Sequence, residues 1–145
     1  MKWINRSILV LAFLGSIDAG YLSWMRLNNQ IVRCADFLGD CQAVTSSRFS
    51  EFYGIPVAYI GFLGYILLFL LSMILLRDTR PVHEYINYLR IAFSFFGFLF
   101  SLYLVFLQLF VLHDICVFCM ISAFFMTLIF ALTMLNTYLF LNNSM

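Results

Sequence analysis

Charged residues are scarce in this sequence, and their scarcity excludes two large classes of protein. Only 10% of the 145 residues are charged, whereas 64% are hydrophobic and 18 are phenylalanines. A soluble domain of this size could not keep so much apolar surface out of water. The formal net charge is only +1, without a basic stripe, which argues against nucleic acid as a partner because phosphates require clustered Lys and Arg. Internal repeats and low-complexity tracts are also missing.

The apolar residues gather in four long blocks, at about residues 7–27, 56–76, 91–112 and 116–141. Each is long enough for a helix that spans the hydrocarbon region, which takes about 20 residues. Blocks of this length do not have the alternating or amphipathic pattern of a globular core. The sequence therefore predicts an all-α membrane protein, a four-transmembrane-helix bundle that forms a single domain over residues 1–145. An outer loop with a short interfacial helix is expected between the first two spans.

The basic residues predict the orientation of the bundle, because short cytoplasmic loops carry an excess of Lys and Arg. Five basic residues fall on the side of the amino terminus, namely Lys2, Arg6, Arg77, Arg80 and Arg90. Three fall on the other side, namely Arg26, Arg33 and Arg48. We therefore expect a multi-pass protein of the cell membrane with both termini in the cytoplasm and all four cysteines on the extracytoplasmic face.

The four cysteines form two pairs on that oxidising face, where disulfides persist. Cys34 and Cys41 share a polar loop, and Cys116-Val-Phe-Cys119 opens the fourth span. A cysteine at a helix N-terminus has its thiolate favoured by the backbone dipoles. We expect Cys116 to lie nearer water and to be the more easily attacked, and Cys119 to meet an apolar electron acceptor one turn deeper. The pattern suggests a relay that passes electrons from thiols to a molecule dissolved in the bilayer.

Other interpretations of the cysteines remain open at this level. They could form structural disulfides, or bind zinc as Cys-x6-Cys with Cys-x2-Cys. Zinc is disfavoured because the second pair enters hydrocarbon, so no metal is predicted. The alternative from another class is a non-enzymatic membrane protein, such as a small transporter or an assembly subunit, whose disulfides only staple loops. Its polar pathway would then consist of Asp18, Gln108 and Asn136.

Two features of the spans are candidates for a binding pocket. Asp18 lies inside the first span. An acidic residue within a membrane span is costly and is therefore a candidate functional residue. It could bond near the pocket or accept protons, or it could be a protonated packing residue. Ala123, Thr127 and Ala131 follow Cys119 at steps of four, which predicts that this stripe faces the bundle interior. The stripe could serve helix packing alone, or a flat ring could stack above Ala123.

The motifs, taken in order, resemble those of the vitamin K epoxide reductase family. They are four spans, an outer-loop cysteine pair, Val44-Thr45-Ser46-Ser47-Arg48-Phe49, Gly54-Ile55-Pro56-Val57-Ala58 and a Cys-x-x-Cys that opens the fourth span. The resemblance implies a membrane thiol–disulfide oxidoreductase that supports disulfide bond formation. It also implies a membrane quinone, ubiquinone or menaquinone, as co-substrate and a thioredoxin-like (DsbA-like) dithiol protein as extracytoplasmic partner.

The resemblance also implies roles for individual residues. Cys116 and Cys119 correspond to the quinone-facing pair, with Cys119 meeting the ring, and Cys34 and Cys41 to the shuttle pair that accepts electrons from the partner. The candidates for quinone binding are Ser47, Phe49, Ala123 and Asp18.

Two differences between this sequence and its relatives, and a comparison with a second family, make the expected function more specific. Animal relatives that reduce the epoxide carry a tyrosine where this chain has Ala123, so plain quinone reduction is expected. Many bacterial members have a fused thioredoxin-like domain, which this sequence lacks, so we expect a separate partner protein. The quinone-linked oxidase of the Dsb system also has four spans and two cysteine pairs, but there the Cys-x-x-Cys comes in the first outer loop.

Overall fold

The computed structural model describes residues 2–28, 48, 51–77, 82–113 and 115–144. The elements of this part are, in order, α1 (Lys2–Leu27), β1 (Glu51–Phe52), β2 (Ile55–Pro56), α3 (Val57–Leu76), α4 (Val82–Phe106), the π-helical η3 (Leu107–Leu112) and α5 (Val117–Ser144). The predicted site residues Cys34, Cys41, Ser47 and Phe49 lie outside the described residues.

Four helical segments are long and apolar enough to cross a membrane, which confirms the predicted four-span, all-α fold. Their surfaces carry large apolar side chains such as Trp3, Leu63 and Phe96, which are 76%, 67% and 68% exposed. A surface of this kind suits lipid and not water, because soluble monomers rarely expose large contiguous apolar patches. The chain is therefore a multi-pass membrane protein.

Two of the helices begin earlier than predicted. α1 starts at Lys2, and the third span starts at Val82, nine residues before the predicted start at residue 91. The polar first turns of these helices interrupt the apolar runs without interrupting the backbone hydrogen bonds. As a result Arg90, which was counted above with the basic residues of the short loops, lies inside α4, so its assignment to the loop between the second and third spans was wrong.

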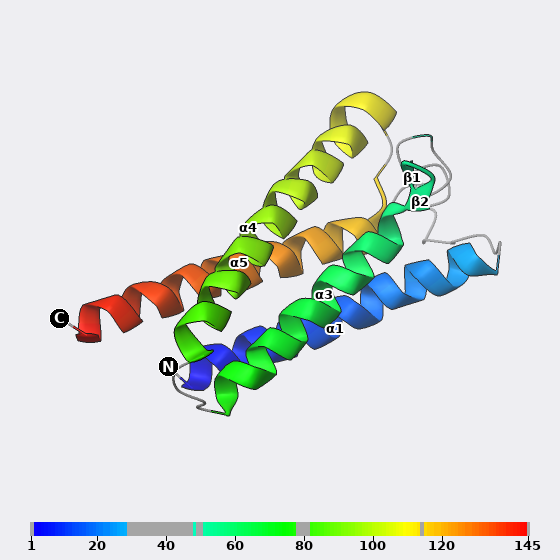
Figure 1. The fold of residues 1–145 in the computed structure, drawn as a ribbon. Coiled ribbons are helices and arrows are strands. Elements are labelled where there is room, and N and C mark those ends of the chain that lie inside the picture. Colours follow the sequence, from blue (N-terminus) through cyan, green and yellow to red (C-terminus); the bar gives the residue numbers. More distant parts are fainter. Residues whose placement is uncertain (1, 29–47, 49–50, 78–81, 114, 145) are drawn as a thin grey trace.

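The helices form a bundle in which α1 contacts α3 and α5, and α4 lies against α5 and α3 (Figure 1). Successive helices run in opposite directions, and both chain termini lie at the same end (Figure 1). We call this the terminal end, and the opposite end, where α5 begins, the cysteine end. α1 and α3 approach closely at Gly15, where any Cβ would overlap the ring of Tyr65. Small residues at such crossings let membrane helices pack against each other.

A buried polar network joins three helices toward the terminal end. The side chain of Arg90 is 0% exposed and donates hydrogen bonds to Asn5 Oδ1 of α1 at 2.9 Å and to Asn87 Oδ1 at 3.0 Å. Asn87 Nδ2 donates in turn to Thr137 Oγ1 of α5 at 3.4 Å. A cation in hydrocarbon requires such partners, because an unpaired charge there is costly. The network therefore ties α1, α4 and α5 together.

A β-hairpin precedes α3 at the cysteine end. Strands β1 and β2 pair antiparallel, with Phe52 opposite Ile55. Tyr53 and Gly54 form the turn, with φ values of 53° and 81°, and two positive φ values are typical of the tight turns that match strand twist. The expected interfacial helix does not include these residues. An ion pair between Glu51 and Arg26 connects the hairpin to the last turn of α1.

Candidate functional site

The Cys-x-x-Cys pair lies where the link from η3 enters α5. The third span ends in a π-helical turn, and His113 then reverses the chain with φ 53°. Cys116 is the residue before α5, and its carbonyl accepts the first helical hydrogen bond, from the N–H of Met120 at 3.0 Å. The N–H of Cys116 donates to Oε1 of the buried Gln108 at 3.0 Å. Gln108 therefore holds the backbone of the first cysteine against the end of the preceding span.

Cys116 occupies the N-cap position of α5, and both cysteines are free thiols in this structure. The pKa of the Cys116 thiol is lowered, first by a hydrogen bond from the Cys119 thiol and then by the N–H groups of Cys119 and Phe118. Burial and the nearby charge of Asp18 oppose this shift. Unpaired N–H groups at a helix N-terminus stabilise an anion, so Cys116 is the thiol that the fold prepares to carry negative charge.

The exposure of the two cysteines differs from the expectation. Cys116 is 0% exposed, packed with Leu22 of α1 and with Met25, Leu112 and Phe118, whereas Cys119 is only partly buried. The prediction that Cys116 lies nearer water was therefore wrong. The end of α1 and the end of η3 cover Cys116, which the position of this residue in the sequence does not reveal.

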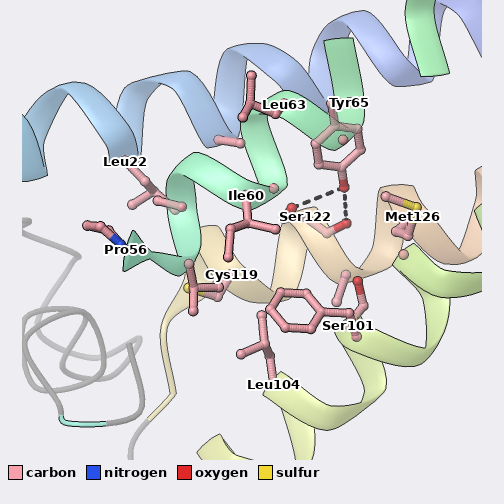
Figure 2. A pocket seen from close by; sticks show the side chains of 18 of the residues that line it. Leu22, Pro56, Ile60, Leu63, Tyr65, Ser101, Leu104, Cys119, Ser122 and Met126 are labelled. Carbon is pink, nitrogen blue, oxygen red and sulfur yellow. Dashed lines mark hydrogen bonds between the residues drawn. The ribbon is translucent and has the colours of Figure 1, made fainter. Parts of the chain in front are cut away.

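A cavity of about 1100 Å³ opens beside Cys119. Its walls come mainly from α3, α4 and α5, and most of its lining is apolar. Figure 2 shows Cys119 at this cavity together with Ile60 and Leu63 of α3 and Leu104 of α4. The volume is slightly above the usual range for small-molecule sites, about 300–1,000 Å³. One sulfur of the pair, that of Cys119, thus belongs to a residue that lines an apolar binding space.

Missing side chains on α3 create part of this space. Gly61 and Gly64 line the cavity, and a Cβ added at either residue would meet no atom within 4 Å. Ala123, one turn after Cys119, also lines it and is partly buried. These glycines are therefore not needed for helix contact, in contrast to Gly15, and side chains added there would project into the cavity.

The cavity contains few polar groups. Tyr65 of α3 is 1% exposed and donates its hydroxyl to the carbonyl of Ser122 at 2.5 Å, with Ser122 Oγ at 3.0 Å (Figure 2). Ser101 and Gln108 contribute a hydroxyl and an amide from the side of α4 and η3. The ion pair of Arg26 and Glu51 lies along the lining at the hairpin. The arrangement resembles ligand sites in general, which are apolar with a small number of placed polar groups.

The other candidate residues from the sequence are only partly brought together here. Asp18 interacts electrostatically with Cys116 and Cys119, and its Oδ2 is buried without a hydrogen-bond partner. It is near the cysteines but is not among the described residues that line the cavity. Thr127 and Ala131 are exposed, so the predicted inward stripe was wrong beyond Ala123.

The prediction of an inward stripe was wrong because each residue four positions further along an α-helix is rotated by about 40° around the helix axis. The face of α5 that is turned inward instead follows steps of three and four. It comprises Cys119, Ser122, Met126, Ile129, Thr133 and Asn136.

The residues proposed as a transport pathway do not share one space. Gln108 lines the cavity, Asp18 does not, and Asn136 is buried away from it. Sequence reasoning missed Tyr65, Ser122 and the two cavity glycines. A tyrosine in the middle of an apolar span could have indicated Tyr65, because a buried hydroxyl requires a partner. Among the residues that the structure describes, three or more His, Cys, Asp or Glu do not gather at any point as a metal site would require.

Comparison with known protein families gives a match over most of the chain. Residues 6–134 match the model of the vitamin K epoxide reductase family. The match covers most of the chain, so the chain belongs to this family, as the resemblance of its motifs predicted. Membership supports a membrane redox role, because the family is one of oxidoreductases linked in general to quinones.

Proposed function

We propose that this member of the vitamin K epoxide reductase family is a quinone-dependent thiol oxidoreductase that supports disulfide bond formation. In this proposal it oxidises a separate thioredoxin-like dithiol protein on the extracytoplasmic side and passes the electrons to a membrane quinone. The observation that carries the proposal is the position of Cys119, which lines a large apolar cavity while its partner Cys116 caps the same helix.

The cavity fits a quinone in size and in chemistry. Its volume of about 1100 Å³ has room for a ring and part of a prenyl chain. The small residues Gly61, Gly64 and Ala123 line the cavity, and the open space beside the two glycines leaves room for a ring. A quinone bound there would supply an acceptor for two electrons and two protons. The residues that would hold it are Cys119, Gln108 and the apolar side chains of α3 and α4.

The rim of the cavity supports access from the lipid. Leu63 of α3 and Phe96 of α4 both line the cavity and are largely exposed, at 67% and 68%. Apolar side chains in these positions would face the hydrocarbon of the bilayer. A lipid-soluble substrate would therefore enter sideways between α3 and α4 without crossing water.

Two thiol–disulfide exchanges would deliver the electrons. The partner dithiol attacks the Cys34–Cys41 disulfide, which oxidises the partner and frees both loop thiols. Cys41 then attacks Cys116 in the Cys116–Cys119 disulfide, and Cys119 leaves as a thiolate. Cys34 displaces Cys116 to restore the loop disulfide, and the membrane pair is left reduced. Because Cys116 is fully buried, this exchange requires its cover of Leu22 and Met25 to move aside.

The membrane pair is then reoxidised. Formation of the Cys116–Cys119 disulfide releases two electrons and two protons, which reduce one quinone to a quinol. The hydrogen bond from the Cys119 thiol and the N-terminal N–H groups of α5 favour a thiolate at Cys116. The excess of basic residues at the terminal end supports a cytoplasmic position of both termini, and in that orientation the whole site would lie near the extracytoplasmic face.

The test uses purified protein that is reduced in detergent and freed of reductant under anaerobic conditions. One equivalent of a short-chain quinone analogue is added, and free thiols are counted by alkylation while quinol is followed by absorbance. We expect thiols to disappear in step with quinol formation, and Cys119→Ser to abolish both. Thiols that persist with benzoquinone and naphthoquinone analogues alike would contradict the proposal and favour structural disulfides.

A further inference from the structure

Gln108 is a buried amide at the end of the third span, where a polar side chain requires a physical explanation. Its side chain is 2% exposed, at the depth where polar groups are costly unless they have partners. It lies in η3, and π-helical turns inside α-helices occur frequently at functional sites. The residue also lines the cavity that contains Cys119. Among the described residues at this cavity, it is the one whose side chain bonds the backbone of the cysteine pair.

The hydrogen bond to Cys116 fixes which way the amide points. A backbone N–H can only donate, so the atom of Gln108 that faces it, at 3.0 Å, must be the carbonyl oxygen. The NH₂ group is therefore on the other branch of the amide. Among the described residues, the side chain of Gln108 makes a hydrogen bond only with Cys116. Its NH₂ group therefore has no acceptor there. An oriented donor without a partner beside an apolar cavity suits a carbonyl oxygen of a ligand.

We infer that Gln108 is a quinone-binding residue whose NH₂ group donates a hydrogen bond to a ring carbonyl in the cavity. The inference rests on the proposed function and adds to it a named donor. Through its oxygen Gln108 holds the backbone of Cys116, so a single side chain connects the ring to the cysteine pair. Among the other polar residues at the cavity, Tyr65 and Ser122 already bond each other, and Arg26 is paired with Glu51. Ser101 also lines the cavity, but it makes no described hydrogen bond to the cysteine pair.

Binding is measured with the fully oxidised protein, which cannot reduce a quinone. The probe is a short-chain ubiquinone analogue, and its dissociation constant follows from quenching of the intrinsic fluorescence. We expect Gln108→Met, which keeps the size and loses both hydrogen bonds, to raise this constant about tenfold, the effect of one lost hydrogen bond. The control Ser94→Ala removes a buried hydroxyl of α4 that does not line the cavity, and its constant should stay within about twofold of the wild type.

Gln108→Glu separates quinone binding from a purely structural role. The variant keeps an oxygen for the N–H of Cys116, but it has a donor for the ring only while its carboxyl group is protonated. Its affinity for the analogue should therefore fall as pH rises, whereas that of the wild type should change much less over the same range. In the oxidised protein both cysteines are held in a disulfide and do not titrate. The other ionisable groups that line the cavity or interact with the pair are Arg26, Glu51, Tyr65 and Asp18, and all of them are present in the wild-type control.

The outcomes are distinct. A dissociation constant of Gln108→Met within about twofold of the wild type, or a Gln108→Glu affinity that follows the wild-type pH profile, would overturn the role of Gln108. If Gln108→Met does not fold, the pH profile of Gln108→Glu decides alone. A wild-type protein that neither binds the analogue nor loses thiols to it would overturn the proposed function, and the role of Gln108 with it.

Discussion

Polar groups are treated differently at the two ends of the bundle. Toward the terminal end, the buried Arg90 bonds Asn5 and Asn87, and these hydrogen bonds join three helices, although Arg90 Nε itself is buried without a described partner. At the cysteine end, an apolar cavity separates α3 from α4, and the amide NH₂ of Gln108 and Oδ2 of Asp18 are left without described partners. The first arrangement joins helices through side-chain hydrogen bonds, whereas the second leaves an apolar space between α3 and α4. The network of Arg90 therefore lies at one end of the bundle, and the cavity beside Cys119, where we propose that the chemistry occurs, lies at the other.

The largest effect on quinone reduction is expected from filling the cavity. Gly64→Leu places a side chain where a Cβ meets no atom within 4 Å, so we expect the helices to pack as before while the ring is excluded. Quinone reduction should fall about a hundredfold or more, equivalent to about 2.7 kcal/mol or more of lost binding, with a thermal midpoint close to that of the wild type. The measurement is quinol formation together with thermal unfolding in detergent.

Gly15→Ala is the matched control for that variant. Its Cβ would overlap the ring of Tyr65, so overpacking should lower the unfolding midpoint by an amount that corresponds to about 1–3 kcal/mol. A Gly64→Leu protein that reduces quinones at the wild-type rate would show that the cavity beside Cys119 is not where the quinone binds.

Removing a partner of Arg90 tests the terminal end. Asn5→Leu leaves a buried guanidinium without one of its two acceptors, which should destabilise the protein by about 1.5–3 kcal/mol, the usual effect of a lost hydrogen bond to a charged group. The KM for the quinone should remain unchanged, because Asn5 does not line the cavity. Thermal unfolding and steady-state kinetics together check this. A raised KM with unchanged stability would mean that the two ends are not separate.

The thiol of Cys119 should control the charge on Cys116. Its hydrogen bond is the largest cause that lowers the pKa of Cys116, so Cys119→Ala should raise that pKa, and the thiolate of Cys116 should form only at higher pH. Cys119→Ser keeps a hydroxyl donor and should preserve more of the shift. The ultraviolet absorbance of the thiolate, titrated in a background of Cys34→Ser and Cys41→Ser, measures both. Identical titrations for the two variants would contradict the role of this hydrogen bond.

The smallest effect is expected for Tyr65→Phe. The change removes the hydroxyl that bonds Ser122 and keeps the ring that packs against Gly15. Hydrogen bonds between membrane helices contribute about 0.6 kcal/mol on average, so the unfolding midpoint should shift only slightly. A large loss of quinone affinity in this variant would instead identify Tyr65 as a second donor to the ring.

The sequence predicted the spans well and the interior of the bundle poorly, for one physical reason. Apolar runs determine where helices cross the bilayer, and the start of α5 was predicted within one residue. Lipid and the bundle interior are both apolar, however, so hydrophobicity does not distinguish the inward face from the outward one. The exposure of Thr127 and Ala131 and the burial of Cys116 therefore required the three-dimensional arrangement.

The surroundings of Gln108 and Arg90 were not predicted from the sequence, for a related reason. A single glutamine near the end of an apolar run gives no sign of the π-helical turn in which it lies, nor of the N–H eight residues later that it accepts from. Arg90 resembled a loop residue because the charge interrupts hydropathy, although the partner that buries it, Asn5, is 85 residues away in the chain. Contacts between distant residues of this kind leave no local pattern.

The exposed rim formed by Leu63 and Phe96 bears on which concentration of quinone determines the occupancy of the cavity. If the opening faces hydrocarbon, the concentration that governs occupancy is the mole fraction of quinone in the bilayer and not its molarity in water. Dilution of vesicles with buffer would then leave the rate unchanged, whereas addition of lipid would lower it. Membrane composition would thus act on turnover through partitioning, without any change in the protein.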